Sequence, residues 1–172
     1  MSIAAIARKL KSKYNNFDHH NKKNPLDELF FILCSVKRSE QVYRRAYKSL
    51  KRAFPTYNQI NQASAKKLSK QILWGGMQNQ KSQSLKTLLT MITERFGRPT
   101  LAPLRKMTEV ECEEFLCSLP GVGKKIARCV MMYSLDKKVF PVDTHCWRIS
   151  RRLGWIKSTD KPKFCSSRNM DL

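Results

Sequence analysis

Residues 119–155 carry the signal that decides the fold, and they read LPGVGKKIARCVMMYSLDKKVFPVDTHCWRISRRLGW. Gly121 and Gly123 stand between two stretches with helical apolar spacing, and glycine permits backbone conformations and close approaches that a side chain obstructs. We therefore predict a tight hairpin between two helices. The second helix should run from about Lys124 to Ser134, and its unpaired N–H groups and dipole suit a phosphate oxygen.

The same stretch contains Asp143, a residue type that is favoured at helix N-caps. We expect it to cap a helix from Thr144 to Leu153. Taken alone, these residues also have ordinary structural explanations. A glycine turn, surface lysines that bind phosphate and a capping aspartate need no catalytic role.

Outside this stretch, apolar residues recur at helical spacing along nearly the whole chain, and no run shows the strict alternation of a strand. The sequence therefore predicts an all-α protein. Caps and breakers place further helix starts near Ser2, Asn24-Pro25, Ser39, Ser64 and Thr108, with another apolar stripe at residues 85–96. We expect Val110, Phe115 and Leu116 to supply the apolar contacts of the helix that starts at Thr108, and the tryptophans Trp74, Trp147 and Trp155 to pack in the core.

The charge of the chain predicts a polyanionic partner. It has 34 Lys and Arg against 13 Asp and Glu, a formal net charge of +21, which favours nucleic acid. Charge alone fits a packaging or ribosomal protein equally well. The six cysteines form no C-x-x-C pair, no apolar run approaches the ~18 residues of a membrane span, and no signal peptide opens the chain. We therefore expect an intracellular protein with reduced cysteines and no membrane partner.

Two blocks within the stretch, LPGVGKKIA (119–127) and PVDTH (141–145), resemble the diagnostic blocks of the endonuclease III family of helix-hairpin-helix (HhH-GPD) base-excision repair glycosylases. Weaker similarity extends from about residue 25 to 155. The resemblance implies a helical bundle of the six-helix-barrel type over residues 21–134, ending in a helix-hairpin-helix at about 109–134. Residues 1–20 and 135–172 would form a partial second helical domain whose C-terminal end is truncated or disordered.

The resemblance also implies catalytic roles for Lys125 and Asp143. An amine must be neutral to attack carbon, and the ordinary lysine pKa is about 10.4. A helix N-terminus beside Lys124 and Arg128 would supply positive potential that favours the neutral amine. Lys125 would attack the sugar C1′ as the base departs, and the resulting Schiff base would undergo β-elimination. Asp143 would stabilise oxocarbenium-like charge or relay the proton.

DNA contacts follow from the same resemblance. Residues matching the family's backbone-binding positions are Gly121, Val122, Gly123, Lys124 and His145. Lys37 stands where the family usually has a glutamine that fills the space of the flipped base, and Met77 stands at a second wedge position. Both residues also have ordinary structural explanations. Lys37 fits a solvated surface lysine, and Met77 fits a loop methionine packed in the core.

The C-terminal end departs from the family. Only 29 residues follow Asp143, and among them only Cys146 and Cys165 are cysteines, so we predict that the family's four-cysteine iron-sulfur cluster is absent and that no metal binds. We expect a truncated product whose first helix and last helix expose apolar surface. The leading hypothesis is a monomeric glycosylase and AP lyase acting on double-stranded DNA that contains a damaged base or an abasic site. The alternative is a non-catalytic helix-hairpin-helix DNA-binding protein.

Overall fold

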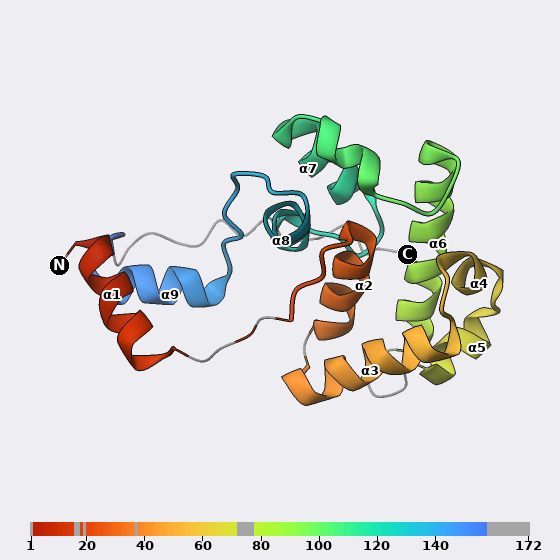
Figure 1. The fold of residues 1–172 in the computed structure, drawn as a ribbon, viewed down its shortest axis with the longest axis horizontal. Coiled ribbons are helices and arrows are strands. Elements are labelled where there is room, and N and C mark those ends of the chain that lie inside the picture. Colours follow the sequence, from red (N-terminus) through yellow and green to blue (C-terminus); the bar gives the residue numbers. More distant parts are fainter. Residues whose placement is uncertain (1, 16–17, 19, 37, 72–77, 158–172) are drawn as a thin grey trace.

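The computed structural model describes residues 2–15, 18, 20–36, 38–71 and 78–157. These residues form helices and connecting segments, with no strand among them, which confirms the predicted all-α class. Figure 1 shows the arrangement. The elements are α1 (Ile3–Lys13), α2 (Pro25–Ser35), α3 (Glu40–Ala53), α4 (Tyr57–Gln62), α5 (Ala65–Gln71), α6 (Gln78–Phe96), the 3-10 helix η2 (Ala102–Lys106), α7 (Glu109–Ser118), α8 (Lys124–Ser134) and α9 (Thr144–Arg152).

Capping residues begin several helices where the sequence predicts them. The Ser2 hydroxyl accepts a hydrogen bond from the Ala5 N–H at 3.3 Å. The Asn24 side chain accepts from the Leu26 and Asp27 N–H groups, with Pro25 as the first helical residue. Thr108 and Glu111 form a complete capping box. Each cap satisfies N–H groups that the helix itself leaves unpaired, so these boundaries are encoded locally.

One helix was absent from the sequence prediction. The short α4 follows Pro55, where a loop is expected, and it begins with a capping box formed by Thr56 and Gln59. The Thr-x-x-Gln spacing is a helix-start signal. It was missed because the helix carries a single buried apolar residue, Ile60, and therefore shows no apolar period.

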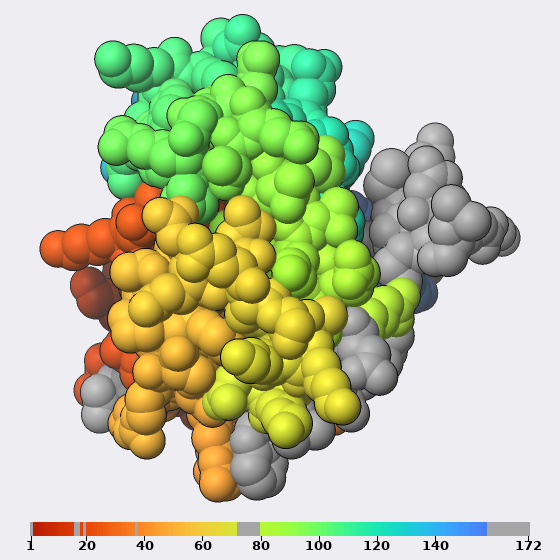
Figure 2. All heavy atoms as spheres, turned by 90° about the vertical axis from the view of Figure 1, so that its right-hand side faces the viewer, coloured from red at the N-terminus to blue at the C-terminus, as the bar shows by residue number. Residues whose placement is uncertain are grey.

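The core lies where α2 packs on α3 and α8, α5 packs on α6, and α7 packs on α8. The stripe at residues 85–96 is buried as predicted, and Leu88, Leu89 and Ile92 are fully enclosed. Figure 2 shows α4 and α5 in yellow packed against α6, with α7 in green above them. Phe30 on α2 is the largest fully buried side chain and contacts the Tyr57 ring edge-on at 5.0 Å between centroids.

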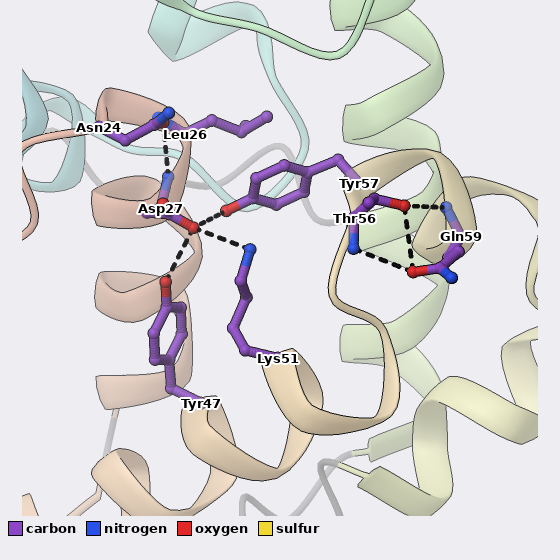
Figure 3. Close-up of polar contacts among 8 residues, drawn as sticks. All are labelled: Asn24, Leu26, Asp27, Tyr47, Lys51, Thr56, Tyr57 and Gln59. Carbon is purple, nitrogen blue, oxygen red and sulfur yellow. Dashed lines mark hydrogen bonds and ion pairs between the residues drawn. The ribbon is translucent and has the colours of Figure 1, made fainter.

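A polar hub ties α2, α3 and α4 together (Figure 3). The Asp27 Oδ1 accepts hydrogen bonds from the Tyr47 hydroxyl at 2.9 Å and the Tyr57 hydroxyl at 2.5 Å. It also pairs with the Lys51 Nζ at 3.1 Å. Burial alone would raise the pKa of Asp27, but these hydrogen bonds and the Lys51 charge leave it below its ordinary value. The carboxylate therefore stays ionised and anchors the start of α2.

The two ends of the described chain are packed differently from the bundle. Neither α1 nor α9 contains a buried residue, and both lie at the left of Figure 1, away from the other helices. Ile3 is 70% exposed and Ile149 is 50% exposed. Two core predictions were wrong, because Val110 is 66% exposed and Trp155 is 48% exposed. Trp147 is only partly buried, with the Arg151 guanidinium 4.8 Å from its ring centroid. No helix in the described part of the chain has the length and apolarity to cross a membrane.

Candidate active site

The predicted hairpin is present between α7 and α8. Gly121 has a φ of +79°, a conformation that side-chain-bearing residues rarely adopt. The Val122 N–H closes the turn by donating to the Leu119 carbonyl at 3.1 Å, and the Val122 side chain is buried in the core. The turn is therefore held by the core on one side, and Gly121 is exposed on the other.

The N-terminus of α8 leaves hydrogen-bond donors available. Gly123 occupies the N-cap in extended conformation and provides no side-chain cap. The Gly123 carbonyl accepts from the Ala127 N–H at 3.0 Å, so the N–H groups before Ala127 have no acceptor within the helix. Lys124 and Lys125 occupy this first turn with exposed side chains. Free N–H groups, the positive end of the helix dipole and two cations together make a site suited to a phosphate.

Glu113 on α7 changes the electrostatics that the sequence suggests. The Arg128 Nε donates to the Glu113 Oε2 at 2.6 Å, and the Arg128 Nη2 donates to Oε1 at 3.3 Å. The Lys124 Nζ lies 3.9 Å from the same carboxylate. Hydrogen bonding to Glu113 raises the pKa of Arg128. The positive potential expected from Lys124 and Arg128 is thus partly neutralised, and Glu113 instead fastens the two helices of the hairpin.

Sequence reasoning did not single out Glu113. The available signal was an acid on the helix before the hairpin and a basic residue 15 positions later on the helix after it. Two antiparallel helices joined by a short turn bring such positions together. The two-point contact between guanidinium and carboxylate is also the geometry that holds best at a partly exposed site.

Asp143 is the N-cap of α9, as predicted. Its Oδ1 accepts hydrogen bonds from the His145 N–H at 2.9 Å and the Cys146 N–H at 3.0 Å. Partial burial pushes the pKa of Asp143 up, but the hydrogen bonds from Cys146 and His145 and the charge of Lys125 outweigh burial and leave the pKa below its ordinary value. The carboxylate is therefore ionised at neutral pH.

Lys125 and Asp143 interact electrostatically although 18 positions separate them in the sequence. Cys129 lies one turn after Lys125 on α8. The pKa of its thiol is affected by the charges of Lys125 and Asp143, and also by Cys146. Burial is the main cause of the raised pKa of the Cys129 thiol, and Lys125 opposes it. The charges of Lys125 and Asp143 therefore affect one another, and both affect the Cys129 thiol.

His145 lies beside this region with an exposed side chain. Its ring Nδ1 is 3.0 Å from the Arg148 Nη2, so the two side chains form a polar pair on successive turns of α9. Lys37 and Met77, the predicted base-flipping residues, lie outside the described residues. The described residues contain no group of three or more His, Cys, Asp or Glu side chains placed to hold a metal ion, and the absence of an iron-sulfur cluster stays a prediction.

Two helices joined by a tight glycine turn, with unpaired N–H groups at the start of the second helix, form a helix-hairpin-helix motif. Comparison with known proteins narrows the class. The HhH-GPD superfamily base excision DNA repair protein family matches residues 32–171. The chain therefore belongs to the HhH-GPD superfamily.

Individual relatives agree with this family. A protein of Arabidopsis thaliana named as a DNA glycosylase is 34% identical over 88% of this chain, which spans 52% of that relative's length. Endonuclease III of Thermotoga maritima is 28% identical over 91% of this chain and 68% of its own. Among solved structures, a trapped covalent intermediate of endonuclease III with DNA superimposes with a TM-score of 0.73 at 22% identity, covering 94% of this chain and 74% of that one.

Proposed function

We propose that this protein is a DNA glycosylase with associated AP lyase activity, acting on damaged or modified pyrimidines in double-stranded DNA. The observation that carries the proposal is that the charge of Lys125, on the first turn of α8, acts on the ionised Asp143 that caps α9. Family membership and the likeness to an endonuclease III covalently trapped on DNA support it.

In the proposed reaction, the unprotonated Lys125 amine forms a bond to C1′ of the sugar. The bond between C1′ and the base nitrogen breaks, and the base leaves with that electron pair. The sugar ring then opens to a Schiff base that joins C1′ to the lysine nitrogen. Loss of a proton from C2′ expels the 3′ phosphate by β-elimination, and water releases Lys125 by hydrolysing the Schiff base.

The state of Asp143 favours one of its two suggested roles. Because its pKa is lowered, the carboxylate binds a proton weakly and is a poor general base at neutral pH. An ionised carboxylate near C1′ instead stabilises the positive charge that develops on the sugar as the base departs. We therefore assign Asp143 to electrostatic stabilisation. The hydrogen bonds from the His145 and Cys146 N–H groups to Oδ1 hold the carboxylate in place at the start of α9.

DNA would enter across the hairpin and the two helix N-termini. The N–H groups at the start of α8 and the Lys124 side chain would hold the backbone on one side of the flipped nucleotide, and the His145–Arg148 pair would hold it on the other. None of these groups distinguishes one base from another, so base selectivity must come from side chains deeper in the site.

Borohydride trapping on duplex DNA with an abasic site tests the proposal. Borohydride reduces the Schiff base to a stable amine, so the wild-type protein should become covalently linked to DNA. Lys125→Gln should give no adduct. Lys124→Gln is the matched control, because it removes a neighbouring cation on the same turn and should bind DNA less tightly at raised salt yet still form the adduct.

Two results would contradict the proposal. One is a wild-type protein that binds the duplex and forms no adduct, which would favour the non-catalytic DNA-binding alternative. The other is an adduct of undiminished yield with Lys125→Gln, which would place the nucleophile elsewhere.

A further inference from the structure

An acid-free stretch of the sequence gives one side of the bundle a strongly basic surface. No Asp or Glu occurs in residues 41–93, a range that includes α4, α5 and most of α3 and α6. The same range contains ten basic residues, namely Arg44, Arg45, Lys48, Lys51, Arg52, Lys66, Lys67, Lys70, Lys81 and Lys86. Such a run creates positive potential unless acids from elsewhere in the fold cover it.

Contacts within the fold use only part of this set. Arg44 pairs with Glu40 at 3.3 Å, and Lys51 pairs with Asp27 at 3.1 Å. The Lys86 Nζ donates to a backbone carbonyl of the segment before α5. Five other side chains are exposed and form no ion pair in the part of the chain that the structure describes: Lys48, Arg52, Lys66, Lys67 and Lys70.

On α3 the exposed cations lie opposite the core. Arg45, Lys48 and Arg52 are three and four residues apart, so they follow one side of the helix. The buried residues Ala46 and Leu50 lie on the other side of α3. From Arg45 to Arg52 the helix rises about 10 Å, a length over which one strand of duplex DNA carries about three phosphates.

The short helix α5 extends this surface. Its three exposed lysines are Lys66, Lys67 and Lys70. The helix is anchored in the core by Leu68 and packs on α3, and the Ser49 hydroxyl donates to the Gln71 Oε1 at 3.0 Å. Because Gln71 directly follows Lys70, this hydrogen bond places the end of α5 beside the middle of α3. The α3–α5 basic face therefore consists of Arg45, Lys48, Arg52, Lys66, Lys67 and Lys70.

The α3–α5 basic face is separate from the candidate active site. The main packing partners of α3 are α2 and α5, and that of α5 is α6. The hairpin, by contrast, joins α7 to α8. In Figure 1, α3 and α5 lie along the lower edge of the bundle and α7 lies along its upper edge. The cations of the basic face thus belong to a different part of the surface from the lysines that begin α8.

The chemistry of this face fits phosphates rather than bases or lipid. Bases of single-stranded nucleic acid stack on exposed aromatic rings. On α3 and α5, which are both described in full, no aromatic ring is exposed, and Tyr43 and Tyr47 instead pack their rings against Phe31. A helix that lies on a membrane requires an exposed apolar side, and the one exposed apolar residue of these two helices is Ala53.

We propose that the α3–α5 basic face binds the phosphate backbone of duplex DNA, as a contact surface additional to the hairpin and α9. Membership of a base-excision DNA repair family supports duplex DNA as the polyanion. Cations on phosphates fix position without reading bases, so this contact holds undamaged and damaged DNA alike. The inference goes beyond the proposed function, because the face can bind DNA whether or not Lys125 forms a Schiff base.

The salt dependence of DNA binding tests the proposal. The triple variant Lys66→Gln, Lys67→Gln and Lys70→Gln removes three cations of the face. Each cation on a phosphate contributes about 0.9 to the slope of log affinity against log salt concentration. For an undamaged duplex, we therefore expect the slope to become less steep by about two to three, and the affinity at about 0.1 M salt to fall about tenfold or more. Fluorescence anisotropy measures both quantities.

A second triple variant removes the same charge from the other end of α6. It carries the substitutions Arg95→Gln, Arg98→Gln and Lys106→Gln. These side chains are exposed and lie at the end of α6, just after it, and in η2, outside the α3–α5 basic face. This variant should keep the wild-type slope. Thermal unfolding checks that both triple variants are folded, as expected for substitutions of exposed side chains.

Lysine acetylation provides a measurement on the wild-type protein, without any substitution. Acetylation rates are followed by mass spectrometry in the absence and presence of the undamaged duplex. Lys66, Lys67 and Lys70 should react several-fold more slowly when DNA is bound, because phosphates cover their amines. Lys106 should react at the same rate in both conditions.

Two results would overturn the proposal. One is an equal slope for the two triple variants, which would show that the charge of the whole molecule, rather than this face, attracts DNA. The other is unchanged acetylation of the α5 lysines when DNA is bound. Trapping on abasic-site DNA separates these outcomes from failure of the proposed function. A wild-type protein that forms no adduct but shows protected α5 lysines contradicts the lyase proposal alone, and an adduct without that protection contradicts only the present inference.

Discussion

The bundle from α2 to α8 and the outlying pair α1 and α9 differ in how they are held. The buried hydrophobic side chains lie between Leu26 and Leu135, and none belongs to α1 or α9. Both outlying helices have local start signals, since Ser2 accepts one N–H of α1 and Asp143 accepts two N–H groups of α9, as Asn24 does for α2. Capping therefore sets where a helix begins, while its stability in the folded protein comes from tertiary burial.

The candidate active site spans the border between these two regions. Lys125 extends from α8, whose residues Ala127, Val130 and Met131 are fully buried. Asp143 extends from α9, which has no such anchor. The nucleophile is therefore fixed by the core, and the carboxylate depends on how α9 is positioned. Low local stability is typical of elements that move when a ligand binds, so we expect α9 to adjust its position when DNA binds.

Amide hydrogen exchange should show the largest contrast. Amides in the middle of α6 and α8 should exchange only through global unfolding, which costs about 5–15 kcal/mol in a typical domain. Amides of α1 and α9 should exchange through local opening that costs little, because no buried contact opposes it. Equal protection of residues 3–13 and of residues 85–92 would contradict the comparison.

The same hydrogen-exchange measurement, repeated with DNA bound, tests whether α9 contacts DNA. With abasic-site duplex present, protection should rise in α9, which carries Asp143 and His145, and change little in α6. A rise confined to the bundle would show that α9 takes no part in holding DNA.

Truncating one leucine in each region should give the next largest contrast. Leu88 on α6 is fully buried and Leu10 on α1 is 53% exposed. Leu88→Ala should lower the free energy of unfolding by about 2–5 kcal/mol because it leaves a cavity. Leu10→Ala should change it by less than about 0.5 kcal/mol. Urea denaturation followed by circular dichroism measures both, and a comparable loss from the two substitutions would mean that α1 is packed in solution.

The sequence predicted the fold where the physical signal is local. Asn24 before Pro25, the Thr108 and Glu111 pair, and the apolar period of residues 85–96 each depend on neighbours within one or two helical turns, and all were confirmed. The hairpin and the capping role of Asp143 were predicted for the same reason. Val110 and Trp155 were assigned to the core wrongly, because apolar character does not reveal whether another element covers the residue.

The electrostatics of the site could not be predicted in the same way. The sequence predicts that Lys124 and Arg128 are cations without a nearby acid. In the structure, both form ion pairs with Glu113 of α7. The Glu28 carboxylate is buried with Oε2 bonded to the Lys22 N–H and with no partner for Oε1 among the described residues, and no spacing along the chain encodes this arrangement. Long-range contacts of this kind exist only in the folded chain and leave no local pattern in the sequence.

The smallest contrast concerns pH and the two aspartates whose pKa values are lowered. An acid with a lowered pKa in the folded state stabilises the protein above its unfolded pKa of about 3.9, and this contribution is lost as the pH falls through the folded pKa. Asp27 anchors three helices of the bundle, so Asp27→Asn should lower the free energy of unfolding by about 1–3 kcal/mol at pH 7. The free energy of unfolding of this variant should also fall less steeply as the pH is lowered.

The pKa of Asp143 is shifted in the same direction, but Asp143 caps a helix outside the core. Asp143→Asn should therefore leave the unfolding of the bundle nearly unchanged at every pH. Urea titrations of both variants between about pH 3 and 7 measure this, and a parallel loss in the two would show that α9 unfolds together with the bundle as one cooperative unit.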